Sequence, residues 1–536
     1  MLFNSWEFIC GFLPVTLAGY YCSAKRSPGI AEAWLVLCSL VFYGWWNAYF
    51  VILLAGSVAF NYCVGELVVR SAEGSTEQSL ILTGGIAGNL LLLFYYKYCG
   101  PVVGFLHAHG LAAATGGGII LPLGISFFTF TQIGYLVDSA EGAAKDRGPL
   151  EYALFVTFFP HLIAGPIVHH KEMMPQFADA RTYRFDASNL TVGVTIFVIG
   201  LAKKVLLADS VAYWADAVFA KPMHLTVISA WGGAISYSMQ LYFDFSGYSD
   251  MAIGLARMFG IILPLNFNSP YKSCSIIDFW SRWHMTLSRY LGLYLYDPIA
   301  LWITRRRVAA GKGASRKAMA SLGGFAGMVV MPLFVTMSLA GVWHGAGLQF
   351  LCFGLLHACY LSANHGWRVF GRHHSAVERL RDSRVLTAAG VTGGVILTYV
   401  AVVVSLVFFR AGSVPAAVAV VKTMASLARP LFHPVGLTAN ALLASKAASA
   451  APPVSAMAGA TLRKIGEIGF PALLVWTMPN TQQIMAAFSP ALDMTGVETE
   501  RMIRWSPNLT WSVAIGALLF VCLGLMDNSK FIYFQF

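Results

Sequence analysis

Long hydrophobic runs separated by short polar segments dominate the chain. Within most runs the hydrophobic positions are continuous rather than confined to one face, so a helix built from them has no side suited to water. Several runs have about the 20 residues that a helix needs to cross a bilayer, and proline and glycine interrupt many others. We therefore expect tilted, kinked and re-entrant membrane helices. The runs lie near residues 8–22, 33–55, 80–99, 119–137, 150–168, 190–218, 225–265, 320–340, 348–363, 386–409, 466–488 and 510–526.

The composition supports the same interpretation. Of the 536 residues, 57% are hydrophobic and 11% are charged. A water-soluble protein has about 25% charged residues, so a soluble enzyme fold is excluded as the main body of the chain. The hydrophobic content is enough for roughly ten to twelve spans. The sequence therefore predicts an all-α polytopic membrane protein with additional re-entrant and interfacial helices.

The net charge of +11 is concentrated in clusters that predict an orientation. Residues 302–317 carry six lysines and arginines and no acid, and residues 366–384 carry five arginines against two acids. The positive-inside rule places both loops in the cytoplasm, and His344, which lies between them, at the far leaflet or inside the membrane. The same count places the Ala/Ser/Pro-rich residues 411–464 outside the cytoplasm. Since no basic helix stands outside the hydrophobic runs, we expect no nucleic-acid partner.

The segment Asp278–Tyr296 is a first candidate for chemistry. Drawn as one continuous helix, it places Arg282 and Arg289 opposite an apolar face that includes His284. Burial disfavours the imidazolium form, so His284 should stay neutral and able to accept a proton. The alternative is a core histidine that bonds a neighbouring carbonyl. The apolar face consists of Trp280, Trp283, His284, Leu287, Leu291 and Tyr294.

His344 is a second candidate, because glycines at 341, 345 and 347 remove side chains from around it. Such glycines let a backbone or a bound substrate come close, and an ionisable residue at membrane depth is a candidate for function by default. The alternative is a Gly-rich turn in which the histidine caps a helix end.

A third group of polar residues lies within the longest hydrophobic run, in the segment Tyr242–Asp250. Asp244 and Asp250 are too deep in the run to be ordinary surface acids, and Arg257 is two helical turns beyond Asp250. These residues either hold helices together through ion pairs or line a polar tunnel. His161, His169, His170 and Glu172 offer no fourth ligand at metal-site spacing, so no metal is expected.

Eight elements occur in order along the chain: Leu121–Phe130, Phe159–Ile167, Tyr242–Asp250, Asn266–Tyr271, Asp278–Arg289, Val342–Ala346, Phe408–Ala411 and Phe531–Phe536. In order and number they resemble the membrane-bound O-acyltransferase (MBOAT) superfamily, in particular its bacterial branch that includes alginate O-acetyltransferase. The resemblance implies a single MBOAT domain over residues 1–536. Its N-terminal helices would span 1–265, its catalytic region 266–365 and its C-terminal helices 366–536.

The resemblance also implies the functional residues. The Arg-Trp-His and Trp-His-Gly elements carry the family's two functional histidines, which are His284 and His344 in this chain. His344 would be the base, and His284 would position the donor or polarise its carbonyl. The expected substrate-binding residues are Trp283, Arg282, Trp343, Asp244, Asp250, Asn266 and Ser288.

The family's activity implies an O-acetyltransferase in the bacterial inner membrane. It would pass an acetyl group from a cytoplasmic thioester, expected to be acetyl-CoA, to hydroxyls of an extracytoplasmic polysaccharide, directly or through a periplasmic acetyltransferase partner. After Leu287-Ser-Arg289 the chain lacks the Arg-Asp pair that the family commonly has, which leaves the acceptor open among alginate, cellulose, another exopolysaccharide and peptidoglycan. Two functions of other classes are a transporter of the donor or of a glycan precursor, and a scaffold subunit.

Overall fold

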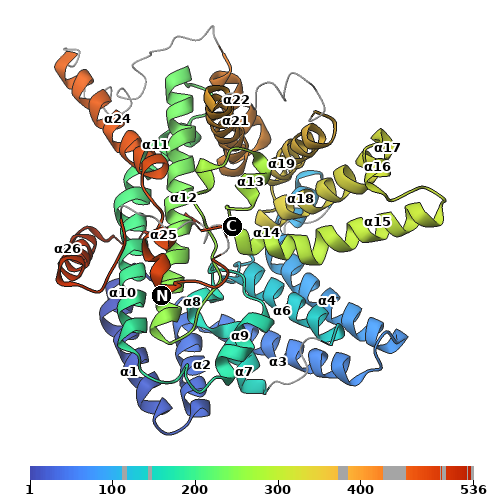
Figure 1. The fold of residues 1–536 in the computed structure, drawn as a ribbon, viewed down its shortest axis with the longest axis vertical. Helices are drawn as coiled ribbons and strands as arrows, with labels where there is room; N and C mark the ends of the chain where they lie inside the picture. Colours follow the sequence, from blue (N-terminus) through green and yellow to red (C-terminus); the bar gives the residue numbers. More distant parts are fainter. Residues whose placement is uncertain are drawn as a thin grey trace.

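The computed structural model describes residues 1–111, 118–142, 148–371, 384–426, 454–494, 496–497, 503–527 and 529–532. Across these ranges the chain is helical, and the only β-pairing is an isolated bridge between Pro264 and Leu492 (Figure 1). This confirms the all-α fold. The helices are α1 (Leu13–Ala24), α2 (Pro28–Gly44), α3 (Tyr49–Arg70), α4 (Thr76–Lys97), α5 (Cys99–Ala108), α6 (Ile125–Ala140), α7 (Pro149–Thr157), α8 (Phe159–Leu162), α9 (His170–Ala178), α10 (Ala187–Ala202), α11 (Asp209–Ala220), α12 (Val227–Met258), α13 (Ile276–Trp280), α14 (Met285–Leu291), α15 (Asp297–Ala309), α16 (Arg316–Met319), α17 (Leu322–Phe325), α18 (Met331–His344), α19 (Leu348–Gly366), α21 (Arg384–Arg410), α22 (Val414–Met424), α24 (Val454–Thr477), α25 (Thr481–Met485) and α26 (Leu509–Leu525).

Short irregular turns join several of these helices. The π-helical turns are η1 (Glu7–Phe12), η2 (Lys203–Ala208), η4 (Gly292–Tyr296), η5 (Ala326–Val330) and η6 (Trp367–Gly371). The 3₁₀ turns are η3 (Pro270–Lys272) and η8 (Ala486–Phe488). Because most of these turns continue one helix into the next, the hydrophobic runs form longer bent rods, as the interruptions by glycine and proline predict.

Five helical rods in the described part of the chain are long and apolar enough to cross a membrane. Two of them combine shorter elements, namely Ala187–Ala220 (α10 to α11) and Leu322–His344 (α17 to α18). The other three are α3, α4 and Ala388–Arg410 of α21. Four shorter apolar helices, α2, α5, α22 and α26, accompany them. The expected membrane character is confirmed, whereas the count of ten to twelve spans stays a prediction.

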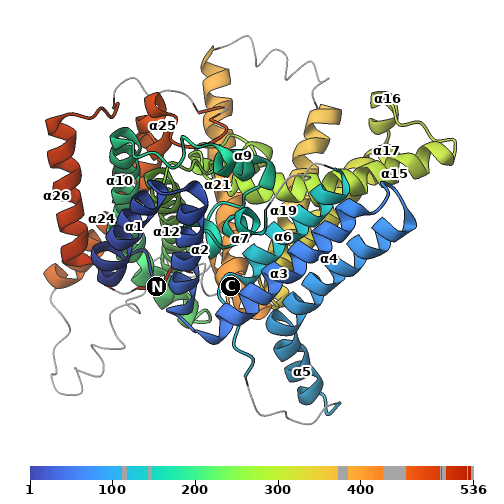
Figure 2. The ribbon, with the colours of Figure 1, turned by 90° about the horizontal axis from the view of Figure 1, so that it is seen from below.

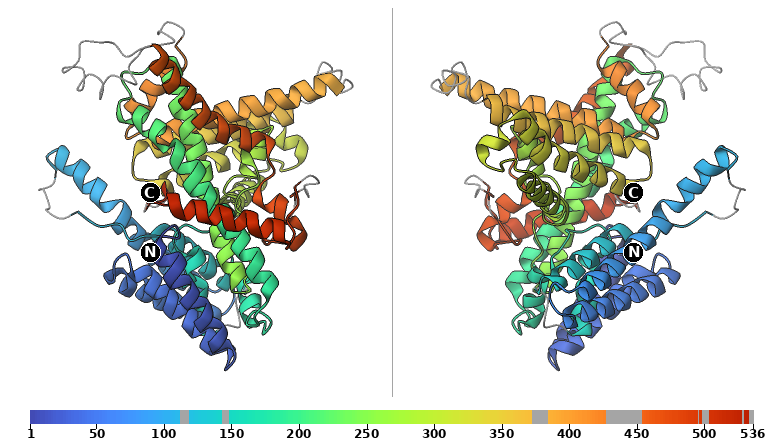
Figure 3. Two further views of the ribbon diagram at one scale, coloured as in Figure 1. Left: turned by 90° about the vertical axis from the view of Figure 1, so that its left-hand side faces the viewer. Right: turned by 90° about the vertical axis from the view of Figure 1, so that its right-hand side faces the viewer.

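The buried helix α12 forms the centre of the molecule. Figures 1 and 3 show it between the N-terminal helices at one end and the helices that follow α18 at the other. Two pairs of glycines bring its backbone against α10. A Cβ atom at Gly193 would lie 2.6 Å from the carbonyl oxygen of Gly254, and one at Gly200 would lie 2.6 Å from that of Gly247. Small residues at a helix interface allow this approach, which is typical of membrane bundles.

Glycines also fix the crossing of α18 with α19, and α18 ends at His344. A Cβ atom at Gly341 would lie 2.3 Å from the carbonyl oxygen of Phe350, and one at Gly354 would lie 2.2 Å from that of Met337. The two backbones are therefore in direct contact. The glycines thus serve packing and set the position of the histidine that ends α18.

Candidate functional site

His344 ends α18 inside a wall of aromatic rings. It is 6% exposed. Its ring centroid lies 5.0 Å from that of Phe409 on α21 and 6.1 Å from that of Phe353 on α19, with the ring planes close to perpendicular. The preceding residue, Trp343, stacks on Phe130 of α6 at 5.0 Å. Three helices besides α18 therefore hold this end of the chain, and burial favours the neutral imidazole that can accept a proton.

Two polar side chains from the end of α4 bind the carbonyl groups at the end of α18. Lys97 Nζ donates a hydrogen bond to the Trp343 carbonyl, and Tyr98 Oη donates to the Val342 carbonyl at 2.8 Å. The last carbonyls of a helix have no partner within the helix and carry the negative end of its dipole, so a cation is favourable here. Lys97 Nζ also donates to Ser126 Oγ on α6 at 3.3 Å.

His284 lies at a break in the chain, where a continuous helix was expected. Helix α13 ends at Trp280 and α14 begins at Met285, and His284 between them has a left-handed φ of 43°. The extended segment before α13 causes the break. Its Asn266 carbonyl accepts from the Met285 N–H at 3.0 Å, and its Asn268 N–H donates to the Arg282 carbonyl at 3.0 Å. A single helix over Asp278–Tyr296 is therefore wrong, because these bonds to another segment replace bonds within the helix.

The side chain of Asn266 determines which nitrogen of His284 carries the proton. Asn266 Oδ1 accepts from the Thr286 N–H at 3.4 Å and from Thr286 Oγ1 at 2.9 Å, while Asn266 Nδ2 donates to Ser249 Oγ at 3.1 Å. Since a backbone N–H can only donate, this orientation of the amide is fixed. His284 Nδ1, 3.0 Å from Oδ1, must then be the protonated nitrogen. In the neutral ring Nε2 therefore carries the lone pair.

The two histidines lie close enough to interact electrostatically, and Lys97 interacts with His344 in the same way. His284 is 1% exposed, and its ring meets Phe245 of α12 edge-on at 4.7 Å. Both imidazoles are therefore buried within electrostatic range of each other, although 60 residues separate them in the chain. The prediction that both belong to one site stays a proposal, and this proximity is the geometry that such a site needs.

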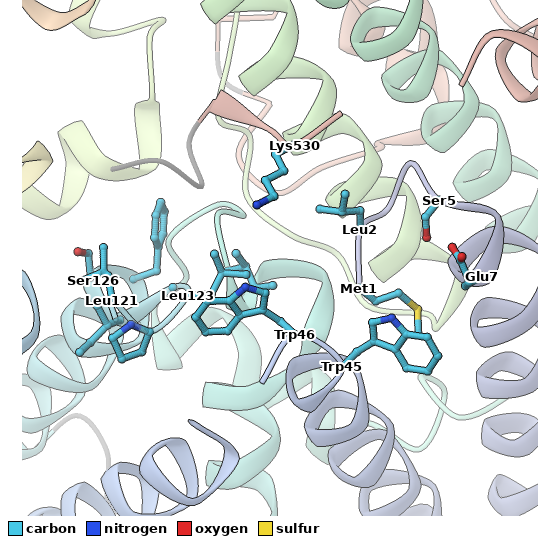
Figure 4. Close-up of a pocket in the computed structure, with 15 residues that line it drawn as sticks. Met1, Leu2, Ser5, Glu7, Trp45, Trp46, Leu121, Leu123, Ser126 and Lys530 are labelled. Carbon is cyan, nitrogen blue, oxygen red and sulfur yellow. The ribbon is translucent and has the colours of Figure 1, made fainter. Parts of the chain in front are cut away.

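Two cavities reach the neighbours of the histidine pair. The first has a volume of about 540 Å³, and Figure 4 shows Trp45, Trp46 and Lys530 around it. Ser126 and Phe127 also line it. Phe127 meets the ring of Trp343 at 5.7 Å, so this wall touches the His344 end of the pair.

The second cavity adjoins His284. It has a volume of about 230 Å³, and its wall includes Thr286, Ser288 and Arg289. Thr286 binds the same Asn266 oxygen as His284 does. His284 therefore adjoins the second cavity through Met285 and Thr286, whereas Trp343 and Phe127 separate His344 from the first cavity. Two separate cavities suit two substrates that arrive separately.

The other expected substrate-binding residues of this region differ in setting. Ser288 lines the second cavity. Trp283 is buried and stacks between Phe279 and Tyr271, so its ring packs the support of the site. Arg282 Nε donates to Asp278 Oδ1 at 2.7 Å at the partly exposed surface.

Asp244 and Asp250 are buried in ion-pair networks. Asp244 Oδ1 accepts from Lys204 Nζ at 2.8 Å. Asp250 Oδ2 accepts from Lys203 Nζ at 2.6 Å, so the expected pairing with Arg257 is wrong. Arg257 binds elsewhere, because its Nη2 donates to the Phe488 carbonyl at 3.4 Å. These pairs tie α12 to η2, as the interpretation of the acids as links between helices predicts.

His169 and His170 belong to a polar network beside the second cavity. His170 Nδ1 lies 3.0 Å from Asp138 Oδ2, and Tyr294 Oη donates to Asp138 Oδ1 at 3.0 Å. Burial raises the pKa of Asp138, but the bonds from His170 and Tyr294 outweigh it and hold the pKa below its usual range. Within the described residues no three histidine, cysteine or acidic side chains are grouped as metal ligands.

Lys97 and Ser126 were missed in the sequence, although a signal for Lys97 exists. It is the sole charged residue among the last 20 of α4 and ends a hydrophobic run, and a charge at such a depth marks a functional candidate. Ser126 lies in the matched element Leu121–Phe130, but nothing in that element distinguishes this serine from its neighbours. Its contact with Lys97 depends on the packing of α4 against α6, which the pattern along one chain does not reveal.

Replacing Asn266 with leucine should destabilise the protein. The change leaves His284 Nδ1–H and the Thr286 N–H without their acceptor, and a buried donor without a partner costs about 1–3 kcal/mol. Thermal unfolding of the purified protein in detergent measures the loss. Ser249→Ala removes only the acceptor of the Asn266 amide, so a smaller loss is expected. Equal midpoints for wild type and Asn266→Leu would show that this amide does not hold the break.

Comparisons with known proteins identify the family. The family model described as MBOAT, membrane-bound O-acyltransferase family, matches residues 90–312. A peptidoglycan O-acetyltransferase of Helicobacter pylori is 39% identical over 454 residues, covering 80% of each chain. A probable alginate O-acetylase of Pseudomonas aeruginosa is 39% identical over 370 residues, covering 68% of this chain and 65% of its own. A teichoic acid D-alanyltransferase of Bacillus subtilis is 28% identical over 323 residues, covering 60% and 76%.

Proposed function

Because the chain belongs to the membrane-bound O-acyltransferase family, we propose that it moves an acetyl group from a cytoplasmic thioester to hydroxyl groups of an extracytoplasmic polysaccharide. The observation that carries the proposal is that His284 and His344 are buried within electrostatic range of each other. One cavity opens beside Thr286, and another is lined by Phe127, which contacts Trp343. The expected donor is acetyl-CoA. The acceptor receives the group directly or through a periplasmic acetyltransferase partner, and the protein resides in the bacterial inner membrane.

The arrangement of the cavities supports transfer across the membrane. The first cavity includes residues near the N-terminus, and the second includes Asp493, which follows α25 and η8. In Figure 2 the N-terminus and α5 lie toward one side, whereas α9, α16 and α25 lie toward the other. The basic segment 302–317 leads into α16, so the positive-inside rule makes that side cytoplasmic. The donor then enters near His284 and the acceptor near His344.

The two imidazoles have different roles in the reaction, because only one of them has to take a proton. His344 takes the proton of the acceptor hydroxyl as its oxygen attacks the acetyl carbon. The carbon–sulfur bond then breaks, and the leaving thiolate takes that proton, which returns His344 to the neutral form. His284 Nε2 has no hydrogen in the neutral ring, so it cannot donate to the acetyl carbonyl. Of the two roles expected for His284, positioning of the donor is the one that fits its bond to Asn266.

Two polymers are candidates for the acceptor. Relatives named as alginate O-acetylases make an alginate-type exopolysaccharide one of them. The longer match to the peptidoglycan O-acetyltransferase, over 80% of both chains, makes peptidoglycan the other.

Mass spectrometry of surface glycans from a deletion strain identifies the polymer. The proposal predicts that one polymer loses its acetyl esters and regains them with the wild-type gene but not with His344→Ala. A scaffold would restore the esters with either gene. A transporter would restore them with His344→Ala as well, and the purified wild-type protein would release no free CoA from acetyl-CoA and acceptor. Either pattern would overturn the proposal.

A further inference from the structure

Lys97 is a partly buried cation with no carboxylate partner among the residues described. Its Nζ donates to the Trp343 carbonyl and to Ser126 Oγ, both neutral, and lies 5.6 Å from the centroid of the Trp343 ring. By contrast, the partly buried Lys203 and the buried Lys204 each bind an acid. Positive charge therefore remains uncompensated beside His344, where it is costly unless an anion forms there.

Capping of α18 explains only part of this geometry. The Val342 carbonyl already accepts from Tyr98 Oη and from the Gly345 N–H without any charge, and Lys97 caps the Trp343 carbonyl. The bond to Ser126 serves no helix end. It connects the ammonium to a hydroxyl on the wall of the first cavity.

The bond from Lys97 limits where the hydroxyl hydrogen of Ser126 can point. An ammonium group can only donate, so Ser126 Oγ accepts from Lys97 and its own hydrogen points elsewhere. No described residue accepts that hydrogen, and Ser126 is buried at the cavity wall. A hydroxyl that accepts from a cation is polarised and becomes a stronger donor toward a ligand. The pair thus presents a strengthened hydrogen-bond donor to the cavity next to His344.

Acetyl transfer needs such a donor. Attack on the thioester places negative charge on the former carbonyl oxygen, and donors aimed at that oxygen supply a large part of the rate. His284 cannot supply one from Nε2, because Asn266 fixes its hydrogen on Nδ1. We infer that Lys97 and Ser126 form the electrophilic pair of this site. Ser126 Oγ–H donates to the oxyanion, while Lys97, which donates to the same Oγ, stabilises the negative charge. No covalent bond forms to either residue. The inference rests on the proposed function.

Steady-state kinetics of the purified protein in vesicles test the pair. The substrates are acetyl-CoA and the acceptor polymer that the mass spectrometry of the deletion strain identifies. Ser126→Ala should lower kcat by about 10²- to 10³-fold and leave both KM values within about threefold, because the lost bond exists only in the transition state. Lys97→Met should lower kcat at least as far. The double variant should lose no more than Lys97→Met alone, since both residues act through one bond. Lys97→Arg should recover part of the rate.

Tyr98→Phe is the matched control, because it removes the other cap of the same helix end without touching the charge. It should keep kcat within about threefold of the wild type. Loss of kcat by Tyr98→Phe as large as that by Lys97→Met would reduce the lysine to a cap and overturn the inference. Full kcat in Ser126→Ala would overturn it too, and the proposed function would stand as long as His344→Ala is inactive. Absence of transfer by the wild type would instead remove the proposed function itself.

Discussion

Replacing His344 with glutamine should lower acetyl transfer by about 10²- to 10⁴-fold, the usual contribution of a positioned base. Glutamine keeps most of the volume between Phe353 and Phe409, so the protein should still fold. The loss should appear in kcat, because the imidazole takes its proton only as the acceptor attacks. Release of CoA from acetyl-CoA in the presence of the acceptor, together with acetyl ester formed, measures the effect.

His357→Gln controls for the cost of removing any buried imidazole near this site. His357 is buried on α19, where its ring nitrogens meet Trp280 Nε1 at 3.2 Å and Ser405 Oγ at 2.9 Å. Its loss should reduce thermal stability and leave kcat within about threefold. If His344→Gln kept the wild-type kcat, or if both variants lost activity equally, His344 would not be the base.

Replacing Lys204 with methionine should destabilise the protein by about 3–5 kcal/mol, the cost of leaving one partner of a buried ion pair uncompensated. Lys204 Nζ donates at 2.8 Å to both Asp244 and Asp209, and Asp244 also accepts from the Ile532 N–H at 2.9 Å. The change therefore loosens η2, α12 and the segment at Ile532 together. Thermal unfolding in detergent measures it.

Lys203→Met is the matched variant one residue earlier. It removes the Lys203 partner of Asp250, but Thr481 and Gln482 still donate to that carboxylate at 2.6 and 2.9 Å. The loss should be clearly smaller than that of Lys204→Met. Adding Asp244→Asn to Lys204→Met should recover part of the stability, because it removes the stranded charge. Unchanged stability of Lys204→Met would return Asp244 to the candidates for substrate binding.

Continuous hydrophobic runs and matched motifs were sufficient to predict the all-α fold and the enzyme family. Both are confirmed by the helices of the structure and by the relatives named above. The run 225–265 contains the buried helix α12. Gly341, one of the glycines near His344, lies at a close helix crossing. These features depend on neighbours in sequence or on the size of one residue, which a single chain reveals directly.

Other features depend on contacts between distant segments, which periodicity does not encode. The break at His284 arises because the backbone groups of Asn266 and Asn268 bond the Met285 N–H and the Arg282 carbonyl on either side of it. The partner of Asp250 is Lys203 across a glycine-lined helix interface rather than Arg257 on its own helix. The contacts of Lys97 with Ser126 and Trp343 depend on the packing of α4 against α6 and α18. The second basic segment, 366–384, lies largely outside the described residues.

The central claim is that the protein transfers an acetyl group from one face of the membrane to the other. Vesicles with the protein in one orientation, acetyl-CoA on the side of residues 302–317 and acceptor polymer on the opposite side test it most directly. Acetylated polymer should form across an intact bilayer, and none should form when the two substrates exchange sides or when His344 is glutamine. Ester formation only after the bilayer is made permeable would contradict it.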